Sequence, residues 1–430
     1  MLLDTNIVKI WIFQIGEPLH IDSSKLRPMR AINLSNKLVE AGHEVVIWSS
    51  SFSHQEKKHR SIEYKIINVN DNLEIRLVPS IGYTKHLSFR RIFDHIQLSL
   101  KLKKILSNEK NSPDVAFLGY PPIEFSAVAS RWLRQKSIPS VLDVKDLWPQ
   151  IFVDALPKFI QPIGKIIFYP YFYYARRTIN DVSAISSMTS SFLQSFLSFS
   201  ERQPKNIDHI FRLTSPIQKI DHDELVEANK WWCNLNIDKS RFNFFFVGTF
   251  SRNFDFKPIA EAAYKAQLNG KGWRFILCGN GPKLDDLKKR MKHLDNVFFP
   301  GWVDSQKINA LGKMSVATIA PYINVDNFIN NIPNKVVDSL ALGLPILSPL
   351  NGEVESLIKN KKVGLFYDKE ISLYQCIDNI SNNKSLQKNL SNNAYKTYVN
   401  SFEFNKVYED FVVYLEKLAK IQVKSLKDKS

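Results

Sequence analysis

The sequence predicts an α/β protein made of two Rossmann-like, doubly wound domains that face each other across a cleft. Three observations support this fold class. The chain has 430 residues, a length typical of two or three domains. Short apolar runs alternate with longer amphipathic runs almost throughout, as in parallel sheets covered by helices on both faces. A polar, irregular stretch at about 201–240 separates two such sets of runs.

The first set begins at the start of the chain. Its predicted strands are, in order, "IVKIWIFQI", "HEVVIWSS", "LEIRLVPS", "DVAFLGY", "PSVLDVK" and "DVSAIS". Helical periodicity lies between most of these runs, for example at 28–41 and 123–135. This alternation predicts a parallel sheet.

The second set repeats the pattern after residue 240. Its predicted strands are "FNFFFVGTF", "WRFILCGNG", "NVFFPGWV", "VATIAPY", "LPILS" and "GLFYD". Helices are expected at 258–268, 283–292 and 304–312. Ligands of open α/β sheets bind at the carboxyl ends of the strands, so the turns there are the candidates for function.

The charge of the chain favours anionic partners. The sequence has 58 Lys and Arg against 42 Asp and Glu, which gives +16 at pH 7 and a pI near 9.5. Such an excess suits nucleic acid, phosphorylated substrates or acidic lipid. The sequence shows no motif of a nucleic-acid-binding domain, so we expect no nucleic acid partner. A basic nucleic-acid-binding protein is the alternative that charge alone leaves open.

The cysteines and the apolar runs bear on location. Cys233, Cys278 and Cys376 lie far apart, without the spacing of a disulfide framework or a zinc site. No run reaches the ~20 apolar residues of a membrane-spanning helix, and no basic leader precedes the first strand. We therefore expect a cytoplasmic protein.

Glycines end two predicted strands of the second set. Gly279 and Gly281 of "LCGNGPKLDDL" stand between a strand and a helix expected to begin near Pro282, where glycine allows a ligand to approach the backbone. In "FVGTFSRN", Gly248 ends a strand, and Arg252 could reach a phosphate. Each turn is weak evidence alone, because an ordinary strand-to-helix turn has the same composition.

The stretch "IPNKVVDSLALGLPILS" predicts a helix at 334–343 that leads directly into a strand. Asn334 and Lys335 stand at the helix start and Asp338 in its middle. A helix start receives phosphates through its free N–H groups, and a carboxylate accepts hydrogen bonds from hydroxyl groups. The alternative is a solvated helix face.

In their order and spacing, "FVGTF", "LCGNGPKL", "NVFFPGWV" and this helix resemble the donor-binding domain of glycosyltransferase family 4, the retaining GT-B enzymes. The resemblance is good over residues 242–365. It is looser in the first half, through "AGHEVVIWSS" and "PSVLDVKDLWP", the latter similar to a subgroup that builds bacterial O-antigen and capsule. It implies transfer of a sugar from a UDP-linked donor to a lipid-linked saccharide. A sugar-nucleotide epimerase of GT-B architecture is the alternative within enzymes.

The resemblance assigns roles on the donor side. Asp338 would bind the ribose hydroxyls, and the helix start with Asn334 and Lys335 would meet the diphosphate. The family's first acidic position falls on Asn330, which cannot stabilise a developing positive charge; Asp326 lies nearby and could replace it. The remaining donor-side candidates are Gly248, Thr249 at the usual arginine position, Arg252, Gly279 and Gly281 at the turns, and Trp302 and Val303 near the base and hexose.

The first half supplies the acceptor side of the resemblance. Gly16 matches a glycine-rich turn, reduced here from two glycines to one, and Glu17, His20 and Arg27 follow it as candidate lining residues or ordinary loop side chains. The resemblance makes Lys145, Asp146 and Asn330 the candidate catalytic residues. Lys145 replaces the family's sugar-contacting histidine, and Asp146 is either an acceptor ligand or a strand-end cap.

The implied chemistry needs neither a cofactor nor a metal. A lysine with a pKa near 10.4 is a poor general base, which suits front-face transfer in which the leaving diphosphate helps to deprotonate the acceptor. The acidic sequence "DHD" at 221–223 stands where a helix is expected to begin, so we interpret it as a cap and not as a metal site.

Two basic, apolar stretches, 88–108 and 158–177, predict contact with an anionic membrane surface. The alternative is that their apolar faces pack on the sheet. We expect an acceptor domain at 1–215 and a donor domain at 216–402, and the resemblance implies that a helix at about 405–420 returns to the first domain. The expected location is the inner face of the cell membrane, with peripheral attachment.

Overall fold

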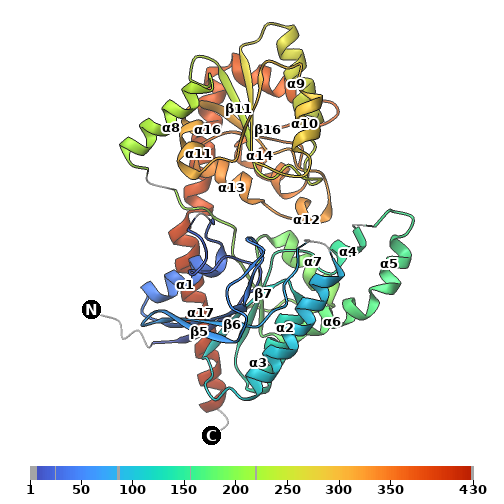
Figure 1. Ribbon diagram of the computed structural model, residues 1–430, viewed down its shortest axis with the longest axis vertical. Helices are drawn as coiled ribbons and strands as arrows, with labels where there is room; N and C mark the ends of the chain where they lie inside the picture. The colour runs from blue at the N-terminus through green and yellow to red at the C-terminus, as the bar shows by residue number, and fades with distance from the viewer. Residues whose placement is uncertain (1–6, 25, 85–87, 155, 218–219, 428–430) are drawn as a thin grey trace. The chain divides into compact units, whose positions relative to one another are not determined.

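The computed structural model describes residues 7–24, 26–84, 88–154, 156–217 and 220–427 (Figure 1). The chain divides into two compact units. Unit 1 comprises Met1–Phe211 and Tyr408–Ser430, and unit 2 comprises Arg212–Val407. Each unit is a Rossmann-like α/β domain built on a mainly parallel sheet, so the prediction of two Rossmann-like α/β domains is confirmed.

The described residues of unit 1 form an eight-stranded sheet in the order β10-β9-β8-β7-β1-β2-β6-β5. Its strands pair in parallel, except that β5 runs antiparallel to β6. The bounds are β1 Lys9–Phe13, β2 Glu44–Ser50, β5 Lys65–Asn70, β6 Leu73–Val78, β7 Val115–Tyr120, β8 Ser140–Val144, β9 Ala184–Ser187 and β10 His209–Ile210; β3 Phe52–Ser53 and β4 Lys58–His59 form a separate ribbon.

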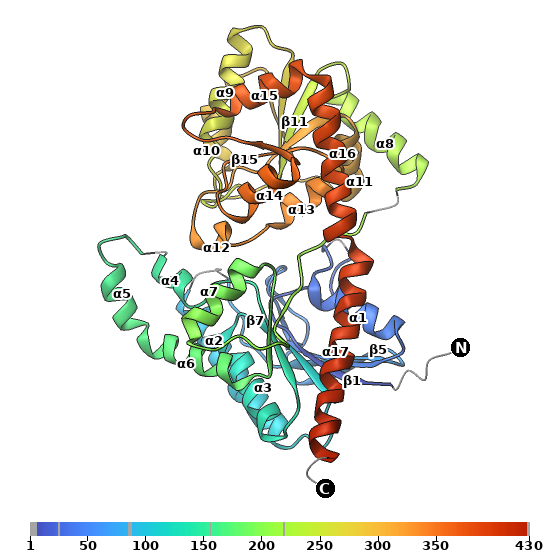
Figure 2. The ribbon, with the colours of Figure 1, turned by 180° about the vertical axis from the view of Figure 1, so that it is seen from behind.

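Helices cover both faces of the unit 1 sheet. Successive strand residues point to opposite faces, so the central strands pack side chains against helices on both sides. On β1, Trp11 and Phe13 belong to the core cluster that also contains Leu98 and Leu102 of α2. On the other face, Phe117 of β7 lies edge-on to Phe411 of α17. Figure 2 shows α1 and α17 on this second face.

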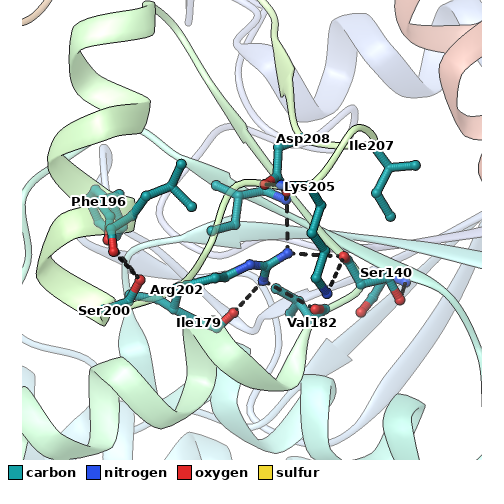
Figure 3. Close-up of polar contacts among 12 residues, drawn as sticks. Ser140, Ile179, Val182, Phe196, Ser200, Arg202, Lys205, Ile207 and Asp208 are labelled. Carbon is teal, nitrogen blue, oxygen red and sulfur yellow. Dashed lines mark hydrogen bonds and ion pairs between the residues drawn. The ribbon is translucent and has the colours of Figure 1, made fainter.

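The helices of unit 1 fill the intervals between strands. Their bounds are α1 Arg30–Glu40, α2 Phe89–Ser107, α3 Ile123–Gln135, α4 Gln150–Asp154, α5 Gln161–Ile167, α6 Tyr169–Asp181 and α7 Ser190–Ser200, and α17 Phe404–Lys427 ends in this unit. The buried Arg202 fixes the segment after α7 (Figure 3). Its guanidinium donates to the carbonyl oxygens of Ile179 and Val182 and pairs with Asp208 at 3.3 Å.

The described residues of unit 2 form a six-stranded parallel sheet in the order β13-β12-β11-β14-β15-β16. This order places β11 and β14 at the point where the chain reverses direction across the sheet, which is where doubly wound folds bind ligands. The strands are β11 Phe242–Val247, β12 Trp273–Cys278, β13 Val297–Gly301, β14 Ser315–Ile319, β15 Ile346–Ser348 and β16 Gly364–Phe366.

The helices of unit 2 are α8 His222–Asn234, α9 Lys257–Leu268, α10 Leu284–Arg290, α11 Ser305–Lys313, α12 Asp326–Ile329, α13 Asn334–Ala341, α14 Glu353–Lys361, α15 Leu373–Asn382 and α16 Lys384–Ser401. Helix α10 begins two residues later than Pro282, and in the turn before it Lys283 N donates to the Phe250 carbonyl at 3.0 Å.

The loops that follow β11 and β12 touch each other closely. Gly248 N donates to the Cys278 carbonyl at 3.0 Å, and Phe250 N donates to the Asn280 carbonyl at 2.9 Å. A Cβ atom on Gly279 would lie 1.9 Å from the Gly248 oxygen, and one on Gly281 would lie 2.5 Å from the Phe250 oxygen. Both glycines also have positive φ, at +128° and +153°. Backbone packing between the two loops therefore requires glycine at both positions.

We predict that Gly279→Ala lowers the free energy of unfolding by about 1–3 kcal/mol, because the added methyl group overlaps the Gly248 carbonyl. Thermal denaturation of the full chain measures this. Gly272→Ala is the matched control, since its Cβ would lie 4.0 Å from Arg241 Cγ, and we expect a change within about 0.5 kcal/mol. Equal melting temperatures for the two variants would contradict the packing role.

Candidate active site

The predicted site residues divide between the two units. The acceptor-side candidates belong to unit 1, and the donor-side candidates belong to unit 2. Those of unit 1 are Gly16, Glu17, His20, Arg27, Lys145 and Asp146. In unit 2 the structure gathers Gly248, Gly279, Gly281, Lys335 and Asp338 around the carboxyl end of β11 and the helix α13. Thr249, Arg252, Asn330 and Trp302 lie on the loops that follow β11, β13 and β14.

Lys335 is fixed at the carboxyl end of β11. Its Nζ donates to the Val247 carbonyl at 2.6 Å and lies 5.3 Å and 5.5 Å from the ring centroids of Phe246 and Phe254. A Cβ atom on Gly248 would lie 2.1 Å from this Nζ. The missing side chain at Gly248 thus leaves the room that the ammonium group occupies, and a full positive charge stands beside the strand end.

Helix α13 directs its amino-terminal end toward the same region, because Lys335 lies in its first turn. The N-cap residue is Pro333, whose side chain cannot accept a hydrogen bond from the first turn. Val336, Val337 and Leu340 are buried and anchor the helix to the sheet. An exposed Asn334 and an uncapped first turn form the kind of helix start that binds anions.

Asp338 is half-buried one turn after Lys335. Its Oδ1 accepts a hydrogen bond from the Ser215 hydroxyl, and the Tyr398 hydroxyl donates to the Ser215 carbonyl. Burial, together with the nearby Asp338 charge, raises the pKa of Tyr322. The carboxylate is therefore oriented by the segment that precedes α8, a support that the sequence motif did not include.

Asn330 ends α12, and its Nδ2 donates to the Asp326 carbonyl at 3.0 Å. The side chain of Asp326 is exposed in the first turn of the same short helix. The loop after β15 packs directly against this region, since a Cβ on Gly352 would lie 2.2 Å from the Ile329 oxygen. The structure thus holds Asn330 directly after a short helix that the β15 loop supports.

The remaining donor-side candidates differ in exposure. Thr249 and Arg252 are exposed, and Trp302 is 60% exposed. Val303 is 5% exposed, and its side chain packs with Trp232 in the hydrophobic cluster under β12. A ligand could therefore meet Val303 only through its backbone.

In unit 1, Lys145 belongs to a buried network of charges. Its Nζ pairs with Glu17 Oε1 and lies 3.7 Å from Asp143 Oδ2. Arg30 donates to Asp143 at 2.7 Å and to the Phe211 carbonyl at 2.8 Å. Glu17, Arg30 and Asp143 are 4%, 5% and 0% exposed. Because both carboxylates face cations, the network holds Lys145 in one position at the end of β8.

The network also fixes the turn that contains Gly16. Glu17 Oε2 accepts from Ala31 N at 2.9 Å, and Gln55 Nε2 donates to the Gly16 carbonyl at 2.7 Å. Gly16 has φ +84°, which explains the glycine. Asp146 follows Lys145 half-buried, and its carbonyl accepts from Trp148 N at 2.9 Å.

Sequence reasoning missed Arg30 and Asp143. The available signal was the aspartate inside the apolar run "SVLDV", because a buried carboxylate in a strand needs a cationic partner.

His20, a candidate lining residue, hydrogen-bonds Asn36 at 2.7 Å. Asp221 of "DHD" is the N-cap of α8 and completes a capping box with Glu224, as its position predicts. Among the described residues, no cluster of His, Cys, Asp and Glu could hold a metal ion.

Comparison with known proteins gives the family of both halves. Residues 29–207 match the family described as "Glycosyltransferase Family 4", and residues 230–397 match "Glycosyl transferases group 1". The alpha-monoglucosyldiacylglycerol synthase of Acholeplasma laidlawii is 26% identical over 183 residues, which is 40% of this chain and 42% of that enzyme. The chain thus matches less than half the length of this curated relative.

Solved structures share the whole fold at low sequence identity. Sucrose-phosphate synthase from Thermosynechococcus elongatus superposes with a TM-score of 0.70 at 12% identity, covering 98% of this chain and all of the other. Anabaena HepE, solved in complex with UDP, superposes with a TM-score of 0.62 at 12% identity, covering 96% of this chain and all of the other. The chain therefore joins a Glycosyltransferase Family 4 domain to a group 1 domain and belongs to the glycosyltransferases of GT-B architecture.

Proposed function

We propose that the protein is a retaining glycosyltransferase that moves a sugar from a UDP-linked donor to a lipid-linked saccharide, in the synthesis of a bacterial surface polysaccharide such as O-antigen or capsule. The observation that carries the proposal is that α13 presents Lys335, bonded to the end of β11, and one turn later Asp338, bonded to Ser215. The solved HepE complex with UDP and the glycolipid-forming name of the A. laidlawii relative support this choice of donor and acceptor.

The proposed donor site separates two tasks. The Lys335 ammonium and the first N–H groups of α13 neutralise the diphosphate, and the Asp338 carboxylate accepts hydrogen bonds from the ribose hydroxyls. Arg252 and Thr249 on the exposed loop after β11 are placed to add contacts to the phosphates, and Trp302 and Asn330 to the base and the sugar. Gly248, Gly279 and Gly281 allow the two loops and the Lys335 ammonium to pack closely together beside this surface.

The proposed chemistry relies on positioning and charge. The departing diphosphate accepts the proton of the attacking hydroxyl on the same face of the sugar, and Lys335 stabilises the negative charge that develops. In unit 1, the ion-paired Lys145 donates hydrogen bonds to the acceptor, and Asp146 orients an acceptor hydroxyl. Because cationic side chains and a helix start take the role of a divalent ion, we propose that turnover is independent of metal.

Exposed apolar side chains support a membrane surface as partner. Helix α2 packs on the core through Leu98, Leu102 and Leu106, whereas its opposite stripe is solvent-exposed. This stripe consists of Phe89 (90% exposed), Phe93, Ile96 and Leu100. This stripe of α2 therefore does not pack on the sheet.

The second stretch is exposed as well. Phe159, Ile163, Ile166, Ile167, Tyr169 and Tyr173, on and around α5 and α6, are all exposed, and α5 projects from the body of unit 1 in both views (Figures 1 and 2). Exposed cations accompany both surfaces: Lys103 and Lys104 on α2, Lys158 before α5 and Lys165 on α5. Among the described helices, none is long and apolar enough to cross a membrane. We propose that the two surfaces attach the enzyme peripherally to anionic lipid at the inner face of the cell membrane.

The donor site is tested by calorimetric titration with UDP. We predict that Asp338→Ala weakens binding by about 2–4 kcal/mol, because two charge-assisted hydrogen bonds to the ribose are lost. Asp338→Asn retains an acceptor for Ser215 and separates loss of charge from loss of local structure. Asp285→Ala removes an exposed carboxylate from α10 as the matched control. Unchanged UDP affinity in a folded Asp338→Ala variant would refute the ribose assignment.

Membrane attachment is tested by co-sedimentation with vesicles. The full chain should pellet with anionic vesicles at low salt and detach at high salt, because attraction between charges is screened within ~8–10 Å. Replacing Ile163, Ile166 and Ile167 by serine should weaken partitioning at least about tenfold, since each apolar side chain contributes to interfacial binding. The control replaces two exposed residues of unit 2, Val226 and Leu268, by serine. Protein that stays in the supernatant under every condition would contradict the proposal.

A further inference from the structure

A buried serine hydroxyl lies against the carboxylate that we propose as the ribose ligand. Ser215 is 7% exposed, and its Oγ donates to Asp338 Oδ1. A hydrogen bond to a carboxylate is strong because the acceptor is charged, so it favours one orientation of the group. A carboxylate has two oxygens and about four lone-pair sites. The bond to Ser215 is therefore compatible with further bonds from Asp338 to a ligand.

The backbone of Ser215 is fixed from helix α16. The Tyr398 hydroxyl donates to the Ser215 carbonyl at 2.5 Å, and Tyr398 is 0% exposed. One residue earlier, the Thr214 hydroxyl donates to the Phe402 carbonyl. The next residue is Pro216, which restricts the backbone of the residue before it to extended conformations. The Ser215 hydroxyl is therefore carried by a backbone with little freedom.

Helix α16 supports α13 at a second place. The Ser391 hydroxyl donates to the Gly343 carbonyl, just past the carboxyl end of α13, at 2.5 Å. The segment before Ser215 is also anchored on α16, because the Arg212 guanidinium carbon lies 5.8 Å from the ring centroid of the buried Phe402. Only the contact through Ser215 reaches a side chain of the proposed donor site, whereas the contact of Ser391 supports the helix alone.

The surroundings of Asp338 explain why it needs such a donor. The carboxylate is half-buried, and its charge acts on Tyr322, a residue that is 6% exposed. A carboxylate that loses water requires hydrogen-bond donors in its place. Ser215 supplies a donor before any ligand binds, and a diol supplies two more.

We infer that Ser215 is a positioning residue of the donor site: it holds Asp338 in the orientation that accepts both hydroxyls of a ribose. The inference rests on the proposed function and narrows the donor class to sugars linked to a ribonucleoside diphosphate, as opposed to a 2′-deoxyribonucleoside diphosphate. A site that is built to hydrogen-bond a hydroxyl discriminates against the analogue that lacks it, because its own polar group is then left unpaired. A carboxylate oriented before binding strengthens this discrimination.

The test compares two nucleotides on the full chain by calorimetric titration. UDP has both ribose hydroxyls, and 2′,3′-dideoxyuridine diphosphate has neither. The unaltered protein should bind UDP at least about thirtyfold more tightly than the dideoxy analogue. Ser215→Ala should weaken UDP binding at least about fivefold, because Asp338 is no longer oriented. The same variant should change binding of the dideoxy analogue less than about twofold, since the analogue makes no bond to Asp338.

Ser391→Ala is the matched control, because it removes another serine hydroxyl that links α16 to α13. Its preference for UDP over the dideoxy analogue should stay within about twofold of that of the unaltered protein. If Ser215→Ala fails to fold, Tyr398→Phe decides, because it removes the hydroxyl that holds the Ser215 carbonyl. We expect Tyr398→Phe to lower the preference at least about twofold.

The outcomes separate this inference from the donor proposal. Equal weakening of both nucleotides in Ser215→Ala, or an unchanged preference, overturns the positioning role and leaves Asp338 as the ribose ligand. Equal affinity of the unaltered protein for UDP and the dideoxy analogue contradicts the ribose assignment of the donor proposal instead.

A third nucleotide, 2′-deoxyuridine diphosphate, tests the donor class. The unaltered protein should bind it at least about fivefold more weakly than UDP, because one hydroxyl is missing. Ser215→Ala should reduce this difference. Equal affinity of the unaltered protein for UDP and the 2′-deoxy nucleotide overturns the restriction to ribonucleotide donors.

Discussion

The close approach of the loops after β11 and β12 is the constraint on which the proposed donor site depends. The Gly279 backbone lies against the Gly248 carbonyl, where no Cβ atom fits. Gly248 in turn leaves room for the Lys335 ammonium, which the Val247 carbonyl and two phenylalanine rings hold in place. The glycines thus have an indirect role in the proposed site. They leave room for the Lys335 ammonium and the start of α13 at the end of β11.

In unit 1, charged side chains also gather at the carboxyl ends of the strands. The turn after β1 and the end of β8 carry charged groups that form the network of Glu17, Arg30, Asp143 and Lys145. Such a network is costly to bury unless every charge has a partner, so it favours one arrangement of the turn after β1. The same turn, through Gly16, borders a hollow that Tyr83 and Arg91 also line.

The elements with strong periodicity could be predicted from the sequence, because each buries an apolar face. The edge strand β5 was missed, since its residues are almost all exposed and only its pairing with β6 makes it a strand. Helix α2 has two apolar stripes, and periodicity cannot say that Leu98 and Leu102 face the core while Phe93 and Leu100 face solvent. Motif order indicated Lys335 and Asp338. The hollow near Tyr83 had no sequence signal, because its residues come from separate strands and loops.

The central claim is sugar transfer from a UDP-linked donor to a lipid-linked saccharide without metal. It is tested most directly by incubating the purified chain with a set of nucleotide sugars and washed membranes in excess chelator, and by analysing the lipid extract by mass spectrometry. The account predicts release of UDP and a lipid-linked product heavier by one sugar residue, in equal yield with and without chelator. Failure of every donor to modify a lipid, or activity lost with chelator and restored by manganese or magnesium, would contradict it.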